Sequence, residues 1–260
     1  MTTTTIKPDN LNRSGSFSTI SHSGRIAQTD SVESLAAAGR EEGNVLLIDK
    51  PLGWTSFDVV NRVRKAFQVK KAGHAGTLDP KATGLLIVCT GKKTKTIDEY
   101  AGLEKEYEGV MELGATTPSF DSETEVKERK DFSAITGEQV TRVLQSFIGR
   151  QLQVPPMYSA VKHNGKPLYK FARKGRIIER APRAIVISEI EVQAVRLPFV
   201  HFRIVCSKGT YIRALADDCG KKLGCGAYLK QLRRTRIGDF HVADAIQIVP
   251  KESLRQDVVL

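Results

Sequence analysis

The longest uninterrupted apolar runs of this 260-residue chain are only as long as a β-strand, and this limits what it can fold into. Val45–Ile48 and Leu85–Cys89 have the length and aliphatic composition of buried strands. A membrane-spanning helix needs about 20 successive apolar residues, so neither run is long enough to cross a bilayer. We therefore expect a globular protein built around a β-sheet, with no membrane as partner.

Further segments rich in valine, isoleucine and aromatic residues predict more strands. They are Lys105–Leu113, Ala184–Leu197, Phe199–Cys206 and Tyr228–Phe240.

Three segments have the apolar spacing of amphipathic helices, and each carries helix-end residues. The first begins at Thr55 or Ser56. The second begins at Thr136, and Gly149 fits its end. The third covers residues 210–223 and stops at Gly224. Helices and strands alternate without a regular βαβ repeat, so we predict the α+β class: a mixed, largely antiparallel central sheet with flanking helices.

Composition divides the chain into unequal parts. Residues 1–43 are rich in serine and threonine and poor in large apolar residues, which predicts a disordered N-terminal extension. Residues 44–250 form the predicted folded domain, and residues 251–260 a C-terminal tail. Within the domain, Pro155-Pro156 interrupts the pattern and opens an expected insertion at about 155–183.

The net charge of +11 indicates a polyanionic partner, most often a nucleic acid. Residues 1–43 carry −1, so the rest of the chain carries +12. Lys162–Arg183 alone holds eight basic residues against one acidic residue. Such a concentration favours a directed contact over weak binding by the whole surface.

The four cysteines contain no C-x-x-C pair, which argues against a disulfide scaffold and against a local zinc motif. We expect no metal and a reducing, cytoplasmic location. Organelle import is the lesser alternative, because the first 43 residues have the serine content of a transit peptide but contain five acidic residues.

The loop Gly73–Pro80 has the composition of a site that carries chemistry. Two glycines permit close approach of the backbone, and Pro80 keeps Asp79 out of the helical region. A carboxylate on so stiff a loop can serve as nucleophile or base, although Asp-Pro is also an ordinary turn signal.

Residues 73–91 read G-H-A-G-T-L-D-P-K-A-T-G-L-L-I-V-C-T-G, which resembles the catalytic signature of TruB-type pseudouridine synthases, enzymes that modify uridine-55 in the T loop of tRNA. Other blocks resemble the family in order: Lys50-Pro51 with Gly53–Ser56, Lys105–Tyr107, Gly114–Thr117 followed by Asp121, Pro155–Arg173, Ser207–Arg213 and Leu229–Gly238. The resemblance covers about residues 44–249. It implies the pseudouridine synthase fold with a thumb-like insertion. It also implies an isomerase without a cofactor, in the short form of the family that has no C-terminal PUA domain.

The resemblance also assigns roles to residues. Asp79 is implied as the catalytic aspartate, which attacks C1′ of the target nucleotide or removes its C2′ proton. Tyr107 is implied to stack on the target base near the proton lost from C5, and Arg213 to pair with Asp79. Substrate contacts are expected from His74, Tyr211, Leu232 and Lys50.

Basic residues interleaved with Tyr169 and Phe171 predict an RNA-binding insertion, since cations neutralise phosphates and aromatic rings stack on bases. By resemblance it clamps the T arm of tRNA. The expected RNA contacts are Lys162, Lys166, Lys170, Arg173, Lys174, Arg176, Arg233 and Arg234.

Three hypotheses follow from the sequence. The first is a stand-alone tRNA uridine-55 isomerase, expected as a monomer by resemblance. The second is a guide-RNA-dependent relative with the same catalytic fold, as in H/ACA particles. The third is a non-catalytic protein that unfolds and releases tRNA. The basic insertion favours the first over the second, and the set of Asp79, Tyr107 and Arg213 argues against the third.

Overall fold

A computed structural model describes residues 17–20, 26–29 and 42–248 of the chain. One long sheet dominates these residues, with strand order β2-β1-β3-β5-β14-β6-β13-β12-β9. Its strands are β1 (Phe17–Ile20), β2 (Ile26–Thr29), β3 (Val45–Lys50), β5 (Ala82–Thr90), β6 (Lys105–Leu113), β9 (Gly149–Gln153), β12 (Arg183–Arg196), β13 (Phe199–Cys206) and β14 (Ala227–Ile237). The neighbouring pairs are antiparallel except β14 with β5, so the predicted mixed, largely antiparallel sheet is confirmed.

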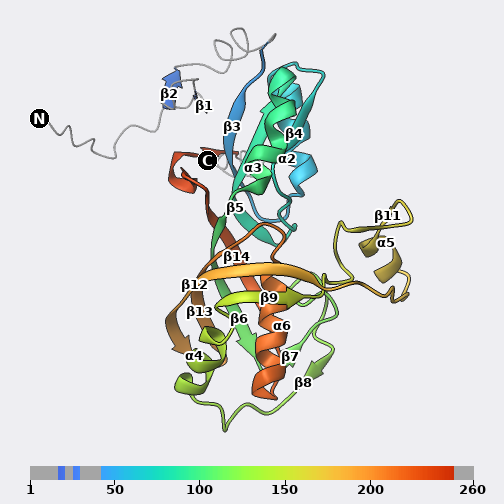
Figure 1. Cartoon of the computed structure of the whole chain (residues 1–260), viewed down its shortest axis with the longest axis vertical. Coiled ribbons are helices and arrows are strands. Elements are labelled where there is room, and N and C mark those ends of the chain that lie inside the picture. The colour runs from blue at the N-terminus through green and yellow to red at the C-terminus, as the bar shows by residue number, and fades with distance from the viewer. Residues whose placement is uncertain (1–16, 21–25, 30–41, 249–260) are drawn as a thin grey trace, which may run out of the picture.

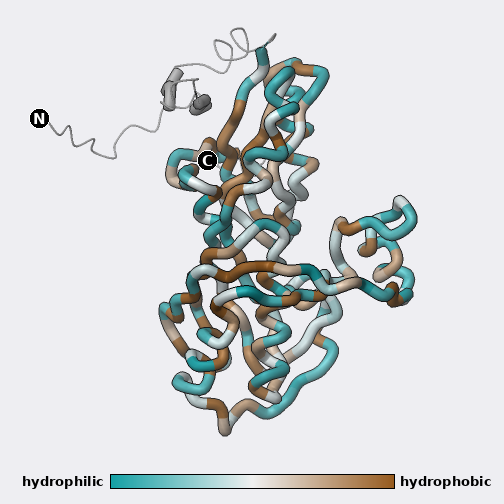
Figure 2. Tube along the Cα trace, in the orientation of Figure 1, coloured by the Kyte–Doolittle hydropathy of each residue, from teal (hydrophilic) through white to brown (hydrophobic). Residues whose placement is uncertain are grey.

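The upper half of the molecule in Figure 1 is built on β3 and β5. Residues that alternate along these strands face opposite sides, and both sides are buried. Leu46 and Ile48 pack with helix α2 (Ser56–Ala66), whereas Val45 and Leu47 face the side of helix α3 (Ile97–Gly102). Burial on both faces explains the continuous apolar runs in the sequence, visible as the brown trace of β3 in Figure 2.

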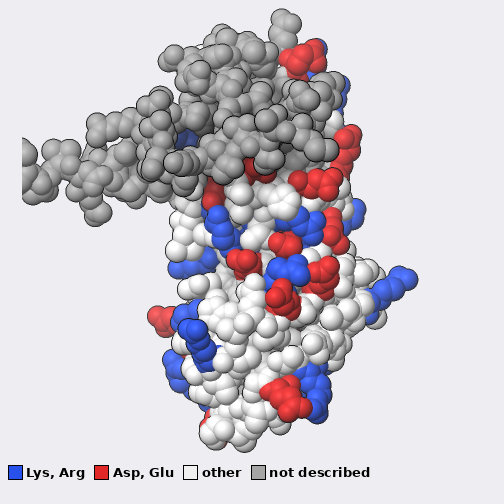
Figure 3. All heavy atoms as spheres, turned by 90° about the vertical axis from the view of Figure 1, so that its left-hand side faces the viewer, with Lys and Arg blue, Asp and Glu red and all other residues white. Residues whose placement is uncertain are grey.

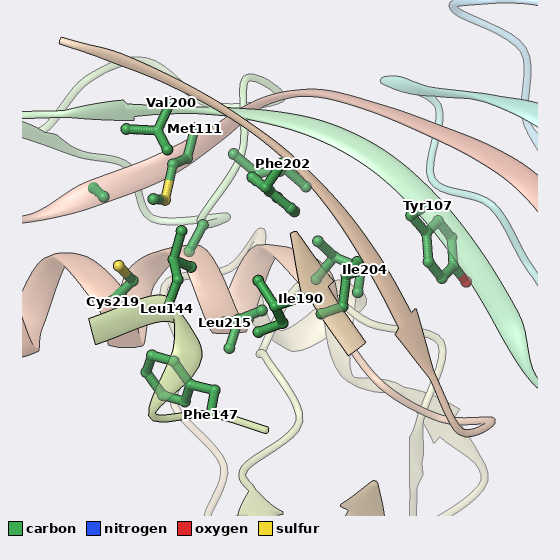
Figure 4. Packing of buried hydrophobic residues seen from close by; sticks show 14 of the residues in the cluster. Tyr107, Met111, Leu144, Phe147, Ile190, Val200, Phe202, Ile204, Leu215 and Cys219 are labelled. Atoms are coloured by element: carbon green, nitrogen blue, oxygen red, sulfur yellow. The ribbon is translucent and has the colours of Figure 1, made fainter. Parts of the chain in front are cut away.

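The lower half packs helices α4 (Gly137–Gln145) and α6 (Ile212–Leu223) against the sheet. Figure 4 shows this core, in which Leu144 and Phe147 meet Leu215 and Cys219 beneath the strands. Both helices begin where the sequence predicts, to within two residues. Thr136 caps α4 in a capping box with Gln139, and Gly224 ends α6 with a φ of +81°.

Two predicted boundaries are wrong. Helix α4 ends at Gln145 with Ser146 as its C-cap, so Ile148 is 46% exposed and Gly149 instead begins β9. The closing strand stops at Ile237, because Gly238 with a φ of +53° turns the chain into the short strand β15 (Phe240–His241).

The insertion between β9 and β12 projects from the side of the molecule in Figure 1. It contains strands β10 (Lys162–His163) and β11 (Lys166–Pro167) and helix α5 (Leu168–Ala172). Asn164 and Gly165 join the two strands with φ values of +50° and +76°, the backbone that an Asn-Gly hairpin turn requires.

The remaining short elements complete the fold. They are β4 (Ala72–His74), 3-10 helix η1 (Gly91–Thr96), β7 (Ala115–Thr116), β8 (Glu128–Arg129), 3-10 helix η2 (Val242–Asp244) and β16 (Ile246–Gln247).

Part of the predicted N-terminal extension pairs with the sheet. Strands β1 and β2 form an antiparallel hairpin, and Thr19 of β1 lies opposite Leu46 of β3. Residues 1–16, 21–25, 30–41 and the predicted tail 251–260 lie outside the described residues. Among the residues that are described, no helix has the length and apolar character needed to span a membrane.

Candidate active site

The loop that carries Asp79 lies between β4 and β5, which pair with each other. The loop predicted at residues 73–80 runs from residue 75 to residue 81 between these two strands. Its backbone is fixed at both ends: the Ala75 amide donates to the Ile87 carbonyl at 2.9 Å, the Ala82 amide to the Asp79 carbonyl at 3.0 Å, and the Gly53 amide to the Pro80 carbonyl at 2.9 Å. Asp79 therefore sits on a constrained segment at the middle of the molecule.

Arg213 and Asp79 form an ion pair, with 2.9 Å between Nε and Oδ2. The Arg213 side chain is only 3% exposed, whereas that of Asp79 is 36% exposed. The guanidinium also donates to the Ser119 carbonyl at 3.1 Å and to the Tyr158 carbonyl. Arg213 is thus held by several partners and presents one edge to a carboxylate that remains open to the cleft.

A second carboxylate stands behind the pair. Asp121 Oδ2 lies 3.7 Å from Nε of Arg213, and its side chain is 7% exposed. Burial raises the pKa of Asp121, and the hydrogen bond from Ser119 and the charge of Arg213 oppose this rise. In the sequence, Asp121 stands out only as a member of a family motif. Its contact with Arg213 depends on the fold, in which Asp121 forms an isolated bridge with Leu229 of β14.

Tyr107 lies on β6 and is 8% exposed. Figure 4 places it at the edge of the lower core, with its hydroxyl directed away from the other labelled residues. Burial raises the pKa of its phenol, and the nearby Arg234 opposes that rise. The ring therefore offers an apolar surface and a neutral hydroxyl at the cleft.

A cleft of about 710 Å³ brings most of the predicted site residues together. Asp79, Tyr107, Arg213, His74, Tyr211 and Leu232 all line it. Gln153 fixes the backbone of Tyr211 by donating to its carbonyl at 3.1 Å and accepting from its amide at 2.8 Å. Burial lowers the pKa of His74, which favours the neutral ring. The cleft thus places the open carboxylate of Asp79 beside several aromatic side chains.

Two predicted contact residues are buried instead. Lys50 has 0% exposure, and its ammonium donates to the carbonyls of Pro51 at 3.0 Å and Trp54 at 2.7 Å. Arg234 is 1% exposed and donates to the carbonyls of Leu85 at 2.7 Å and Gly76 at 3.1 Å. Arg234 does line the cleft, but so buried a position differs from the RNA-facing surface expected from the sequence.

Lys50 and Lys105 are buried cations whose role sequence reasoning did not identify. Lys105 is 4% exposed, and its ammonium donates to the carbonyls of Ala101 and Leu103 at the end of α3. Burial lowers the pKa of each lysine to about 8. Each buried ammonium is stabilised by the backbone carbonyls to which it donates. Lys50 ends β3 and Lys105 begins β6, so the sequence signal that could have found them is a basic residue at the end of a buried strand.

The predicted basic residues of the insertion are all exposed: Lys162, Lys166, Lys170, Arg173, Lys174 and Arg176. Arg173 stacks over Tyr169 at 5.4 Å and reaches Glu123 on the body at 3.3 Å. Tyr169 and Arg173 line the cleft, so the insertion forms part of its wall. By contrast, Arg233 is tied to Asp49 through two hydrogen bonds of 2.6 and 3.0 Å.

The face shown in Figure 3 has a different character, because basic and acidic side chains alternate across its middle. Among such charges, Arg203 of β13 contacts Glu106 of β6 and Glu189 and Glu191 of β12 at 2.7–3.0 Å. These charges largely satisfy one another, so this face lacks the uncompensated basic character of the insertion.

Known families match nearly all of the described domain. Residues 64–212 match "TruB family pseudouridylate synthase (N terminal domain)", and residues 213–258 match "tRNA pseudouridylate synthase B C-terminal domain". A protein of Chlorobaculum tepidum named tRNA pseudouridine synthase B is 49% identical over 80% of this chain and 89% of that protein. One of the same name from Phocaeicola vulgatus is 51% identical over 80% of this chain and 91% of that protein.

Solved structures agree with the fold. A chain of the structure titled "Crystal Structure of a Cbf5-Nop10-Gar1 Complex" has a TM-score of 0.63 and 29% identity, and the match covers 93% of this chain and 59% of that chain. Another, titled "Structure of H/ACA RNP bound to a substrate RNA containing 2'-deoxyuridine", has a TM-score of 0.60 and 27% identity over 93% of this chain and 58% of that chain. The family matches, the identities near 50% and the shared fold show that this chain belongs to the TruB family of pseudouridylate synthases, which are isomerases.

Proposed function

We propose that this enzyme isomerises uridine-55 in the T loop of tRNA to pseudouridine, with Asp79 as its catalytic carboxylate. The observation that carries the proposal is the Arg213–Asp79 pair of 2.9 Å inside a cleft lined by Tyr107 and Tyr211. The relatives with about 50% identity named tRNA pseudouridine synthase B support tRNA as the substrate. The solved Cbf5-Nop10-Gar1 complex and the solved H/ACA RNP are only 29% and 27% identical to this chain, which favours the stand-alone enzyme over a guide-dependent one.

The chemistry breaks the N1–C1′ bond, turns the uracil and forms a C5–C1′ bond. Asp79 either attacks C1′ or removes the C2′ proton, and both routes need an ionised, oriented carboxylate. Arg213 supplies the hydrogen bond that orients this carboxylate. The reaction loses no atom and leaves the oxidation state unchanged, so its balance requires no co-reactant.

Tyr107 acts on the base. A uridine within the T loop must leave its stack to enter the cleft, and aromatic side chains offset part of that cost. Tyr107 and Tyr211 supply such surfaces from two different elements, β6 and the start of α6. The Tyr107 hydroxyl then mediates removal of the C5 proton after the new bond forms.

The insertion holds the T arm. Its six exposed basic residues surround Tyr169 and Phe171, and Arg173 stands at the cleft itself. Phosphates bound along the insertion would direct the T loop toward Asp79.

Family resemblance supports a monomer, and the cysteines support a location in the cytoplasm. All four cysteines are buried and unpaired, which fits a reducing compartment. Light scattering of the purified chain with and without tRNA tests the monomer.

Mapping of pseudouridine on unmodified tRNA, after incubation with the purified full chain alone, tests the function. We expect product at position 55 and none in a tRNA with cytidine at that position. Tight binding without product on any tRNA would contradict the proposal and favour the RNA-folding alternative.

A further inference from the structure

Ser56 joins the first turn of α2 to the loop that carries Asp79. Its side-chain hydroxyl donates to the Leu78 carbonyl at 3.1 Å and accepts from the Leu78 amide at 2.9 Å. Ser56 is 3% exposed, so water does not compete for these bonds. Both bonds end on the residue directly before Asp79, and they fix the backbone from which the catalytic carboxylate projects.

The position of Ser56 does not depend on the loop. Helix α2 is capped by its neighbours: the Asp58 amide donates to Oγ1 of Thr55 at 3.1 Å, and the Thr55 amide donates to Oδ2 of Asp58 at 2.8 Å. Val59, Val60 and Val63 anchor the same helix in the upper core. Ser56 therefore presents its hydroxyl from a rigid support.

The same segment also holds the loop beyond Asp79. The Gly53 amide donates to the Pro80 carbonyl at 2.9 Å. Asp79 is thus bracketed by Leu78 and Pro80, each bonded to residues 53–56, while Arg213 approaches its carboxylate from α6. The two supports come from opposite halves of the molecule, so the Asp79–Arg213 geometry depends on both.

We propose that Ser56 is a positioning residue for the isomerisation, which acts by fixing the backbone of Leu78 so that Asp79 meets both Arg213 and the target nucleotide. This inference rests on the proposed function. Within residues 42–248 the Ser56 hydroxyl has no hydrogen-bond partner other than Leu78. The capping box uses Thr55 and Asp58, so removal of the hydroxyl leaves the cap of α2 complete.

The test compares full-length Ser56→Ala with wild type in single-turnover pseudouridine formation on unmodified tRNA, together with tRNA affinity and Tm. Because small displacements of a catalytic group are costly, we expect a rate loss on the order of 10- to 100-fold, with affinity changed by less than about two-fold. Ser56→Thr retains a hydroxyl and should restore most of the rate. If Ser56→Ala does not fold, Ser56→Cys serves instead, with an intermediate rate because the thiol is a weaker donor.

Asp58→Ala is the matched control, since it removes the carboxylate half of the capping box of the same helix and leaves both bonds to Leu78. It should lower Tm without lowering the rate. A wild-type rate in Ser56→Ala or Ser56→Cys would overturn the inference. Equal rate losses in Ser56→Ala and Asp58→Ala would also overturn it, because helix stability would then explain both. Absence of product with wild type would instead overturn the proposed function, and this inference with it.

Discussion

Arg213 donates from Nε to Oδ2 of Asp79 at 2.9 Å, and its other nitrogens donate to the carbonyls of Ser119 and Tyr158. The carboxylate is therefore oriented by a side chain that is itself fixed on three sides. Asp121 lies 3.7 Å from the same Nε, which places a second negative charge against a single guanidinium. Asp79, Asp121 and Arg213 therefore form one electrostatic cluster with the Arg213 guanidinium at its centre.

Arg213→Lys keeps the positive charge but replaces a planar fork by a single ammonium group. The ammonium cannot reach Asp79 and both carbonyls together, so we expect product formation to fall by about 100-fold. Affinity for tRNA should change little, since the Arg213 side chain is 3% exposed. Arg142→Lys is the control, because Arg142 is an exposed arginine of α4 whose ion pair with Glu138 is far from the cleft. A wild-type single-turnover rate in Arg213→Lys would refute the orienting role.

Neutralising Lys166, Lys170 and Lys174 to glutamine should weaken tRNA binding and flatten its salt dependence. Each lost phosphate contact lowers the slope of log K against log salt by about 0.9. Lys65→Gln, Lys70→Gln and Lys71→Gln together form the control, since they remove the same charge from exposed lysines in the last turn of α2 and in the segment that follows it. Binding titrations at several salt concentrations distinguish the two sets. An unchanged slope in the insertion variant would exclude the proposed clamp.

Much of the scaffold follows from local sequence. Strand β6 matches its predicted bounds of 105–113, and α6 ends at Gly224 as expected, because alternation and a C-terminal glycine are properties of neighbouring residues. Asp79, Tyr107 and Arg213 come together as the family motifs imply.

The burial of Lys50 and Arg234 does not follow from local sequence. Arg234 reaches the Leu85 carbonyl only because β14 lies beside β5. Lys50 binds the nearby carbonyls of Pro51 and Trp54, but it lies opposite Gly84 of β5, a neighbour that only the fold provides. The contact of Asp121 with Arg213 is of the same kind. The sequence predicts a longer α4 because Gly149 is a typical residue at a helix end, although the helix already ends at Gln145 with Ser146 as its C-cap.

The buried ammonium of Lys50 should make stability depend on pH. Burial lowers its pKa from 10.5 to about 8, so the unfolded chain binds more protons than the folded chain between these values. The unfolding free energy contributed by Lys50 therefore rises with pH in this window. Urea unfolding at about pH 7.5 and about pH 9.5 should show a larger gain for wild type than for Lys50→Met. Lys65→Met controls for loss of an exposed lysine, and identical pH dependence in wild type and Lys50→Met would contradict the account.

Gly84 of β5 is required because it lies directly beside Arg234 of the neighbouring strand β14. Its φ is +103°, and a Cβ there would lie 2.2 Å from the Arg234 carbonyl oxygen. Gly84→Ala should destabilise the protein by about 2–4 kcal/mol, because an unfavourable backbone and a steric clash add together. Gly165 has a φ of +76°, but nothing lies close to the position of a new methyl group. Gly165→Ala should therefore lower the unfolding free energy by only about 1–2 kcal/mol. Equal losses of unfolding free energy in the two variants would show that the close approach at Gly84 is unimportant.

The most direct test of the central claim is the single-turnover yield of pseudouridine at position 55 with full-length Asp79→Asn. The substitution keeps the size of the side chain but removes the charge that Arg213 orients. Asp131→Asn, on an exposed loop, is the matched control and should behave as wild type. We predict no product from Asp79→Asn, together with tRNA binding close to that of wild type. Retained turnover in this variant would contradict Asp79 as the catalytic carboxylate.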